Sequence, residues 1–187
     1  QYNGYDLKKV RKYYLKAASL GSDFGKAFAG EILVLLPKNP KDRERGLALL
    51  HEMAGKSIEH SQYALGWDYE FTVRDYDKAI YWYKKAFLGG FPRAFDSLKQ
   101  IYQTHRSDQF SNNLLHAWLQ EGHAAGNDFA TVGLAIQFRE GIHIKQDLLR
   151  AKSLLESIDV RNKRLNAFVA RTILEIGNQI NKQSKEK

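Results

Sequence analysis

The chain has 187 residues and a net charge of +8, and it contains no cysteine. The lack of cysteine excludes disulfide bonds, thiolate metal sites and cysteine nucleophiles. The longest purely aliphatic run, residues 32–36, is far too short to span a bilayer as a helix. The positive charge favours acidic partners or anionic surfaces.

Helical signals follow one another along the chain. A short lead-in precedes a predicted helix over 6–20, and a hairpin of two helices follows over 23–35 and 42–54. The second hairpin occupies 61–90, where Asp75 is placed to begin its second helix. The remaining predicted elements are a helix from Pro92 to about His105, a helix over 112–125, a hairpin over 127–158, a last helix from about 162 to 180, and a frayed polar tail over 181–187.

Helix starts, helix stops and core positions recur in one register. Counting from Asp75, the equivalent helix starts are spaced 36, 33, 36 and 36 residues apart, and all are residue types that favour an N-cap. These starts are Asp6, Asp42, Asp75, Ser111 and Asp147. The corresponding stops are Gly21, Ser57, Gly90, Gly126 and Asn162. The two core positions of each first helix are Ala29, Leu65, Leu98, Leu134 and Ala170, and Leu33, Tyr69, Tyr102, Phe138 and Leu174. A period in this range indicates a solenoid whose units bury their apolar faces against their neighbours.

The segment 61–90 contains L-G-x-x-Y, V-x-D-Y-D-K-A and W-Y-K-K-A, and residues 16–21 read KAASLG. In these motifs the chain resembles the Sel1-like repeats, relatives of the tetratricopeptide repeats. The resemblance implies a right-handed superhelix of helical hairpins that serves as a protein-binding scaffold. Such domains are frequent in bacteria, often exported, as adaptors in secretion, virulence or envelope processes. The chain departs from the pattern where Lys99 and Arg171 replace the packing glycine found at Gly66.

Small residues in the second hairpin predict a close approach of its two helices. Gly66 lies in the first helix, and Ala79 and Ala86 lie in the second, with Trp82 and Tyr83 beside them. We therefore expect Gly66 to sit at the closest contact of the pair, with an aromatic ring nearby.

Catalytic and metal-binding motifs are not supported by the sequence. No H-E-x-x-H, G-x-S-x-G, P-loop or G-x-G-x-x-G pattern occurs. His116 and His123 lie seven residues apart, whereas metal ligands on one helix face favour a spacing of three or four. We therefore expect a protein without enzymatic activity, cofactor or bound metal.

Nucleic-acid binding is the alternative that the charge suggests. The densest basic clusters lie over 7–16 and at the RNKR segment, 161–164. Tyr13 and Tyr14 lie at core spacing with Val10 and Ala17, so we interpret these aromatic residues as packing residues rather than as a stacking surface for bases.

The inner face of the first helices is the better candidate for a binding surface. The third and seventh positions of successive first helices vary in character while the core positions hold. The residues predicted to line this concave face are Glu31, Tyr63, Trp67, Asp96, Gln100, Val132 and Ile136. Tyr63, Trp67, Val132 and Ile136 would form an exposed apolar strip, and aromatic anchors of this kind dominate interface energies. Packing of Trp67 on a neighbouring helix is the equal alternative.

The sequence thus predicts one all-α solenoid domain over 1–180, with about four complete repeats, a leading half-unit and a C-terminal capping helix. Its predicted role is that of a scaffold or adaptor that binds a partner protein, expected to have an acidic surface, in its concave groove. A more specific form of this prediction is a bacterial immunity or inhibitor protein, or a secretion- or virulence-associated adaptor. The alternative is a basic groove that binds nucleic acid or another polyanion.

Overall fold

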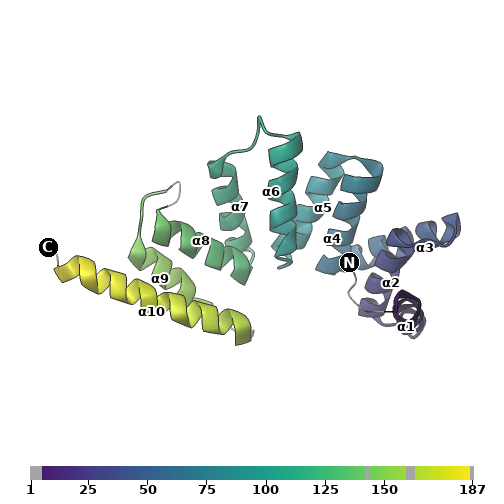
Figure 1. Cartoon of the computed structure of the whole chain (residues 1–187), viewed down its shortest axis with the longest axis horizontal. Helices are drawn as coiled ribbons and strands as arrows, with labels where there is room; N and C mark the ends of the chain where they lie inside the picture. The colour runs from purple at the N-terminus through teal and green to yellow at the C-terminus, as the bar shows by residue number, and fades with distance from the viewer. Residues whose placement is uncertain (1–5, 142–143, 159–162, 186–187) are drawn as a thin grey trace. The chain divides into compact units, whose positions relative to one another are not determined.

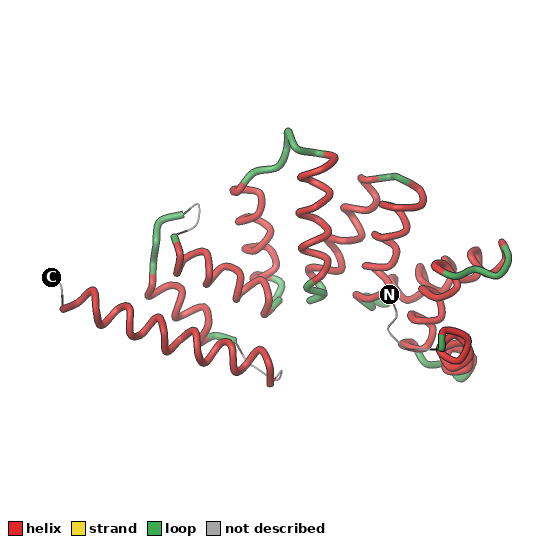
Figure 2. Tube along the Cα trace, in the orientation of Figure 1, coloured by secondary structure: helices red, strands yellow, loops and turns green. Residues whose placement is uncertain are grey.

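The structure, a computed structural model, describes residues 6–141, 144–158 and 163–185, and its regular elements there are all helical (Figures 1 and 2). The helices are α1 (Leu7–Ser19), α2 (Asp23–Leu35), α3 (Pro40–Gly55), α4 (Glu59–Asp68), α5 (Tyr76–Leu88), α6 (Arg93–His105), α7 (Asn112–Ala124), α8 (Asp128–Glu140), α9 (Leu148–Glu156) and α10 (Lys163–Lys185). A π-helical turn, η1 (Tyr69–Val73), follows α4. The predicted all-α repeat fold is confirmed.

The chain forms two compact units. Unit 1 spans Gln1–Ser107 and contains α1 to α6, and unit 2 spans Asp108–Lys187 and contains α7 to α10. Within each unit, consecutive helices pack against each other as hairpins, as the chain order predicts. The single domain over 1–180 stays a prediction.

Side-chain caps begin the second helices as predicted at four of the five positions. The side chains of Asp6, Asp75, Ser111 and Asp147 accept backbone N–H bonds at the starts of α1, α5, α7 and α9. The prediction was wrong for Asp42. Asn39 caps α3 instead, because Pro40 occupies its first turn and the Asn39 side chain accepts from the Asp42 N–H at 3.0 Å. The Asp42 carboxylate accepts from Lys38 N–H and pairs with Arg11 at 2.6 Å.

Left-handed residues end these helices. Gly21, Gly90 and Gly126 have φ values of 87°, 98° and 78°, and Ser57 has a φ of 60°. This conformation is easy for glycine and is strained for serine. The predicted stop at Asn162 lies outside the described residues.

The predicted core register holds at the first of the two core positions, where Ala29, Leu65, Leu98 and Leu134 are all at most 3% exposed. At the second position Leu33 and Phe138 are buried, whereas Tyr69 and Tyr102 are only half-buried. In α10 the register was wrong, since Ala170 is exposed and Leu174 is 67% exposed. The core of unit 2 is instead contacted by Val169, Thr172 and Ile176.

The last helix is longer than predicted. Helix α10 continues to Lys185, so the predicted frayed tail over 181–187 is helical as far as the structure describes it. Arg171, which replaces the packing glycine of the repeat pattern, has an 80% exposed side chain and pairs with Glu175 at 2.9 Å. Helix α10 is therefore a long amphipathic helix with one polar face.

Candidate partner-binding pocket in unit 1

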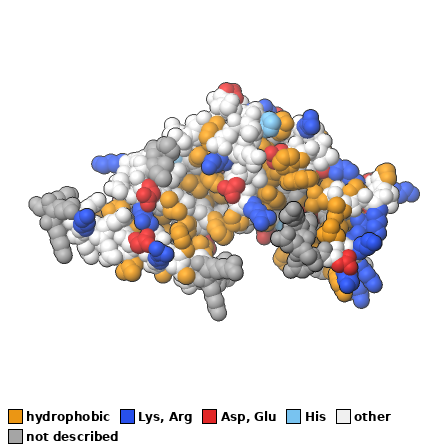
Figure 3. Space-filling view, in the orientation of Figure 1, with side chains coloured by type: hydrophobic (Ala, Val, Ile, Leu, Met, Phe, Trp, Pro, Cys, Tyr) orange, Lys and Arg blue, Asp and Glu red, His pale blue; other side chains and the backbone are white. Residues whose placement is uncertain are grey.

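A pocket of about 260 Å³ opens between the first helices of unit 1. On the face seen in Figure 3, hydrophobic side chains gather over the α4–α6 part of this unit. The pocket is lined by Glu31, Val34, Leu35, Leu50, Tyr63, Ala64, Trp67 and Arg93. Three of the predicted binding residues, Glu31, Tyr63 and Trp67, thus meet around one apolar cavity.

The carboxylate of Glu31 is fixed at the edge of this pocket by the next repeat. Its Oε2 lies 2.9 Å from Nε2 of His60, and both side chains are about one-quarter exposed or less. The His60 ring packs in turn on Phe28 at 4.3 Å between centroids. Helices α2 and α4 therefore present Glu31 in one defined position.

Tyr63 is held among aromatic rings. Its ring centroid lies 5.3 Å from Tyr83 and 4.8 Å from Phe91, distances at which ring pairs stabilise each other. Its hydroxyl accepts a long hydrogen bond, 3.5 Å, from Ser97. Tyr63 is half-buried, so it forms a rigid wall of the pocket rather than a free side chain.

For Trp67 the sequence left two alternatives open, an exposed binding residue and a packed core residue, and the structure shows a part of each. Its ring packs on Phe71 at 5.1 Å, and the residue is half-buried rather than fully enclosed. Its ring N–H has no hydrogen-bond partner within the described part of the chain. One side of Trp67 is therefore packed, while the other lines the pocket.

The predicted residues on α6 do not line the pocket. Asp96 and Gln100 are exposed on that helix, whereas Arg93, at its first turn, does line it. Sequence reasoning missed Arg93 because it precedes the third and seventh positions used to trace the inner face. It is an exposed cation, and it forms no ion pair with any described residue.

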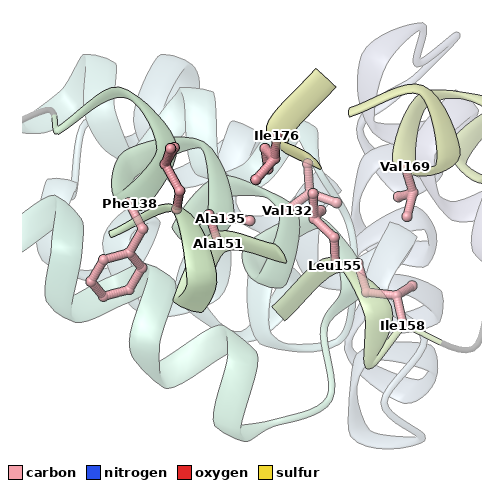
Figure 4. Packing of buried hydrophobic residues seen from close by; sticks show 9 residues of the cluster. Val132, Ala135, Phe138, Ala151, Leu155, Ile158, Val169 and Ile176 are labelled. Carbon is pink, nitrogen blue, oxygen red and sulfur yellow. The ribbon is translucent and has the colours of Figure 1, made fainter. Parts of the chain in front are cut away.

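The unit 2 part of the predicted strip needs a correction. Val132 is only 8% exposed and belongs to a buried cluster with Val169 and Ile176 (Figure 4). Ile136 is half-buried and packs against the same cluster. The prediction that Val132 is exposed was wrong, because Val132 packs in this cluster together with residues of α9 and α10.

The sequence of the chain matches the Sel1 repeat family over residues 5–22 and 59–91. These two segments of the chain are thus identified as Sel1 repeats. The second matched segment carries Tyr63, Trp67 and Gly66, so the candidate pocket is built partly on a recognised repeat.

Two solved structures match the chain. One is the crystal structure of a Sel1 repeat protein from Oxalobacter formigenes, with a TM-score of 0.52 and 21% identity over 81% of this chain. The other is c5321, a protective antigen present in uropathogenic Escherichia coli strains that displays an SLR fold, with a TM-score of 0.48 and 22% identity over 78% of this chain. The chain spans 63% and 32% of their respective lengths. No protein of curated function matches it significantly.

Sel1-like repeats generally serve as scaffolds for protein–protein interactions, and the fold is typically non-catalytic. His116 and His123, the pair considered as metal ligands, bond separately to Gln137 at 2.7 Å and to Thr131 at 2.9 Å. No group of three or more potential ligands gathers among the residues that the structure describes. Within that part of the chain, no helix is both long and apolar enough to cross a bilayer.

A buried carboxyl group supports the repeat that carries Tyr63 and Trp67. Glu70, in η1, is 7% exposed and accepts a hydrogen bond from the Tyr83 hydroxyl at 2.7 Å. Burial raises the pKa of Glu70 above its ordinary value, and the Tyr83 hydrogen bond opposes this shift. The π-helical turn thus places a carboxyl group in the core, where its ionised form is disfavoured.

Replacing Glu70 by glutamine is expected to raise the free energy of unfolding at pH 7 by about 1 kcal/mol, because the amide keeps an acceptor for Tyr83 without a buried charge. An acid whose folded pKa is raised stabilises the fold at low pH, and this contribution is lost as pH rises through the folded pKa. Denaturant unfolding between about pH 4 and pH 7 should therefore show the advantage of Glu70→Gln shrinking toward the acidic end. The exposed Glu44 gives the control variant Glu44→Gln. A variant that is less stable than the wild type at pH 7 would contradict this expectation.

Proposed function

We propose that this chain is a non-enzymatic scaffold that binds a partner protein through the unit 1 pocket. The observation that carries the proposal is the convergence of Glu31, Tyr63 and Trp67 on one apolar cavity of about 260 Å³. Side chains of a partner that fill such a cavity lose their contact with water, which is how aromatic anchors come to dominate binding energy. Asp96 and Gln100, exposed on α6, extend the proposed surface beyond the pocket.

The partner of this proposal presents an acidic surface next to its apolar anchor. Two features support it: the net charge of the chain is +8, and Arg93, which forms no ion pair with a described residue, brings its guanidinium to the pocket edge. Charges at an interface steer encounter and select the partner more than they add affinity. Adaptor roles in bacterial secretion or virulence, or a role as an immunity or inhibitor protein, fit a surface of this kind.

Replacing Trp67 by alanine should weaken partner binding by at least about 2 kcal/mol, or roughly 30-fold. Because Trp67 is only half-buried, its stability cost should stay below the about 3–5 kcal/mol of a fully buried aromatic residue. The partner is first identified by co-purification and mass spectrometry from the native host, and its affinity is then measured by calorimetry alongside thermal melts. The matched control is Tyr13→Ala, which removes an aromatic residue that is 68% exposed and lies outside the pocket. Unchanged binding by a folded Trp67→Ala variant would show that the partner uses another surface.

Binding of nucleic acid or another polyanion is the second candidate, and one observation favours it. The prediction that Tyr13 packs in the core was wrong, since its side chain is 68% exposed, while Tyr14 stacks on Phe28 at 4.9 Å as expected. Lys9, Lys12 and Lys16 are exposed along the same helix. Figure 3 shows Lys and Arg side chains gathered at the end of unit 1 that carries α1 and α3. The other basic cluster, 161–164, has no described side chains.

A salt series separates these two candidates. If the scaffold proposal holds, a generic single-stranded oligonucleotide should bind negligibly at physiological salt in a fluorescence anisotropy assay. Phosphate binding would instead appear as an affinity that falls steeply with salt, with a log–log slope of about −0.7 for each phosphate contacted. A slope of that kind that is reduced in Lys12→Glu, with partner binding absent, would favour the polyanion candidate.

A further inference from the structure

A second pocket, of about 310 Å³, lies at the ends of α3 and α5. It is lined by Ala54, Gly55, Ser57, Gln62, Trp82, Lys85, Leu88 and Gly89. It shares no lining residue with the pocket described above. The adjacent α4 residues Gln62 and Tyr63 line one pocket each, so the two pockets lie on different sides of that helix.

One wall of the second pocket is a cluster of rings. Trp82 is half-buried and makes edge contacts with Tyr81 at 5.1 Å and with His51 at 5.8 Å. Tyr81 is 51% exposed. Leu88 adds an aliphatic side chain to the same cavity. An aromatic residue that is fixed by its neighbours, yet still borders a cavity, offers contact area at little cost in conformational entropy.

A lysine is fixed above these rings. The Lys85 ammonium lies 4.9 Å from the centroid of Tyr81 and 5.5 Å from that of Trp82, within the range of a cation–π interaction. No carboxylate of a described residue pairs with it. The pocket edge therefore carries a positive charge that is held in place and that no described carboxylate neutralises.

Gln62 forms part of the wall of the pocket. It is 5% exposed, and its Nε2 donates to the Ala54 carbonyl at 3.3 Å, which ties α4 to the end of α3. Its Oε1 has no partner among the described residues, but this atom is itself buried and is not open to a ligand in the pocket.

We propose that this second pocket binds a short, extended acidic segment of a partner protein. An apolar side chain of the segment packs on Trp82 and Leu88, and an Asp or Glu carboxylate pairs with Lys85. The aromatic wall and the cation, which no described carboxylate neutralises, are complementary to these two groups. This site shares no lining residue with the pocket around Tyr63 and Trp67, so the failure of one proposal does not contradict the other.

The test uses the whole chain with ¹⁵N-labelled tryptophan, whose three indole signals are assigned by single Trp→Phe variants. The probes are two peptides of equal length, acetyl-Leu-Glu-Leu-Glu-amide and acetyl-Leu-Lys-Leu-Lys-amide. We expect the acidic peptide to shift the Trp82 signal in a saturable way, to leave Trp67 and Trp118 unchanged, and to outcompete the basic peptide. Lys85→Glu should weaken this binding by at least about tenfold. Lys99→Glu, which reverses an exposed charge elsewhere in unit 1, should not.

Equal shifts from both peptides would show apolar adhesion only, and the absence of a shift at Trp82 would show that water fills the pocket. A Trp82 shift that grows with protein concentration alone would show a second copy in the pocket. Each of these results would overturn the proposal.

Discussion

Gly66→Leu should destabilise the chain by about 1–3 kcal/mol or more, because leucine overpacks the contact between α4 and α5. A Cβ at Gly66 would lie 2.5 Å from Cδ1 of the Tyr83 ring. Tyr83 cannot move away easily, since it is fully buried and its hydroxyl is bonded to Glu70 at 2.7 Å. The predicted close approach at Gly66 is thus confirmed as a contact between a glycine and an aromatic ring.

Thermal and urea unfolding measure this effect. The matched control is Gly177→Leu in α10, because nothing lies within 4 Å of a Cβ there. Removing a glycine from a helix interior is stabilising by about 0.5–1 kcal/mol, so this control should be no less stable than the wild type. If Gly66→Leu melts at the wild-type temperature, α4 and α5 are not paired through this contact.

The features that the sequence predicted well depend on local chemistry. A side-chain cap needs only a few consecutive residues, as at Asp75 and Ser111. A left-handed stop needs only one, as at Gly90 and Gly126. Asp42 shows the limit of such reasoning: Asn39 and Asp42 are both cap types three residues apart, and the proline between them decides which one caps α3.

The features that could not be predicted from the sequence depend on which helices pack against each other. In α10 the register changes because this helix packs on the core of unit 2 through Val169 and Ile176, which are buried, and leaves Leu174 exposed. The π-helical turn η1 was not predicted either. It occurs in the repeat whose spacing is 33 residues, where a shorter connection must still reach α5.

The residues of the candidate site also fall into those that local sequence predicts and those that depend on packing. Tyr63 and Trp67 could be predicted from helical spacing within one repeat. Leu50 and Arg93 could not, because they come from the preceding and following helices and meet the pocket only through packing. Val132 satisfied the spacing rule and was nevertheless buried, since spacing gives the face of a helix but not what covers that face.

An ion pair beneath the candidate site joins α3 to α4. Nη2 of Arg43 lies 2.8 and 2.9 Å from the two carboxylate oxygens of Asp68. The Asp68 side chain is only 3% exposed, and that of Arg43 is 30% exposed. Asp68 directly follows Trp67, so this pair also fixes the end of α4 that borders the pocket. An isolated charge at such a depth is costly, whereas a paired charge is tolerated.

Arg43→Met should therefore destabilise the chain by about 3 kcal/mol, at the lower end of the range for breaking a buried pair because Arg43 remains partly hydrated. Urea unfolding at pH 7 provides the measurement, and Arg45→Met, a change at an exposed arginine of the same helix, is the control. The loss comes from leaving Asp68 without a counter-charge, so the double variant Arg43→Met/Asp68→Leu should recover most of it. A double variant that is as unstable as the two single losses combined would mean that each residue acts through its own packing. An Arg43→Met variant as stable as the control would mean that Asp68 does not depend on this arginine for its charge balance.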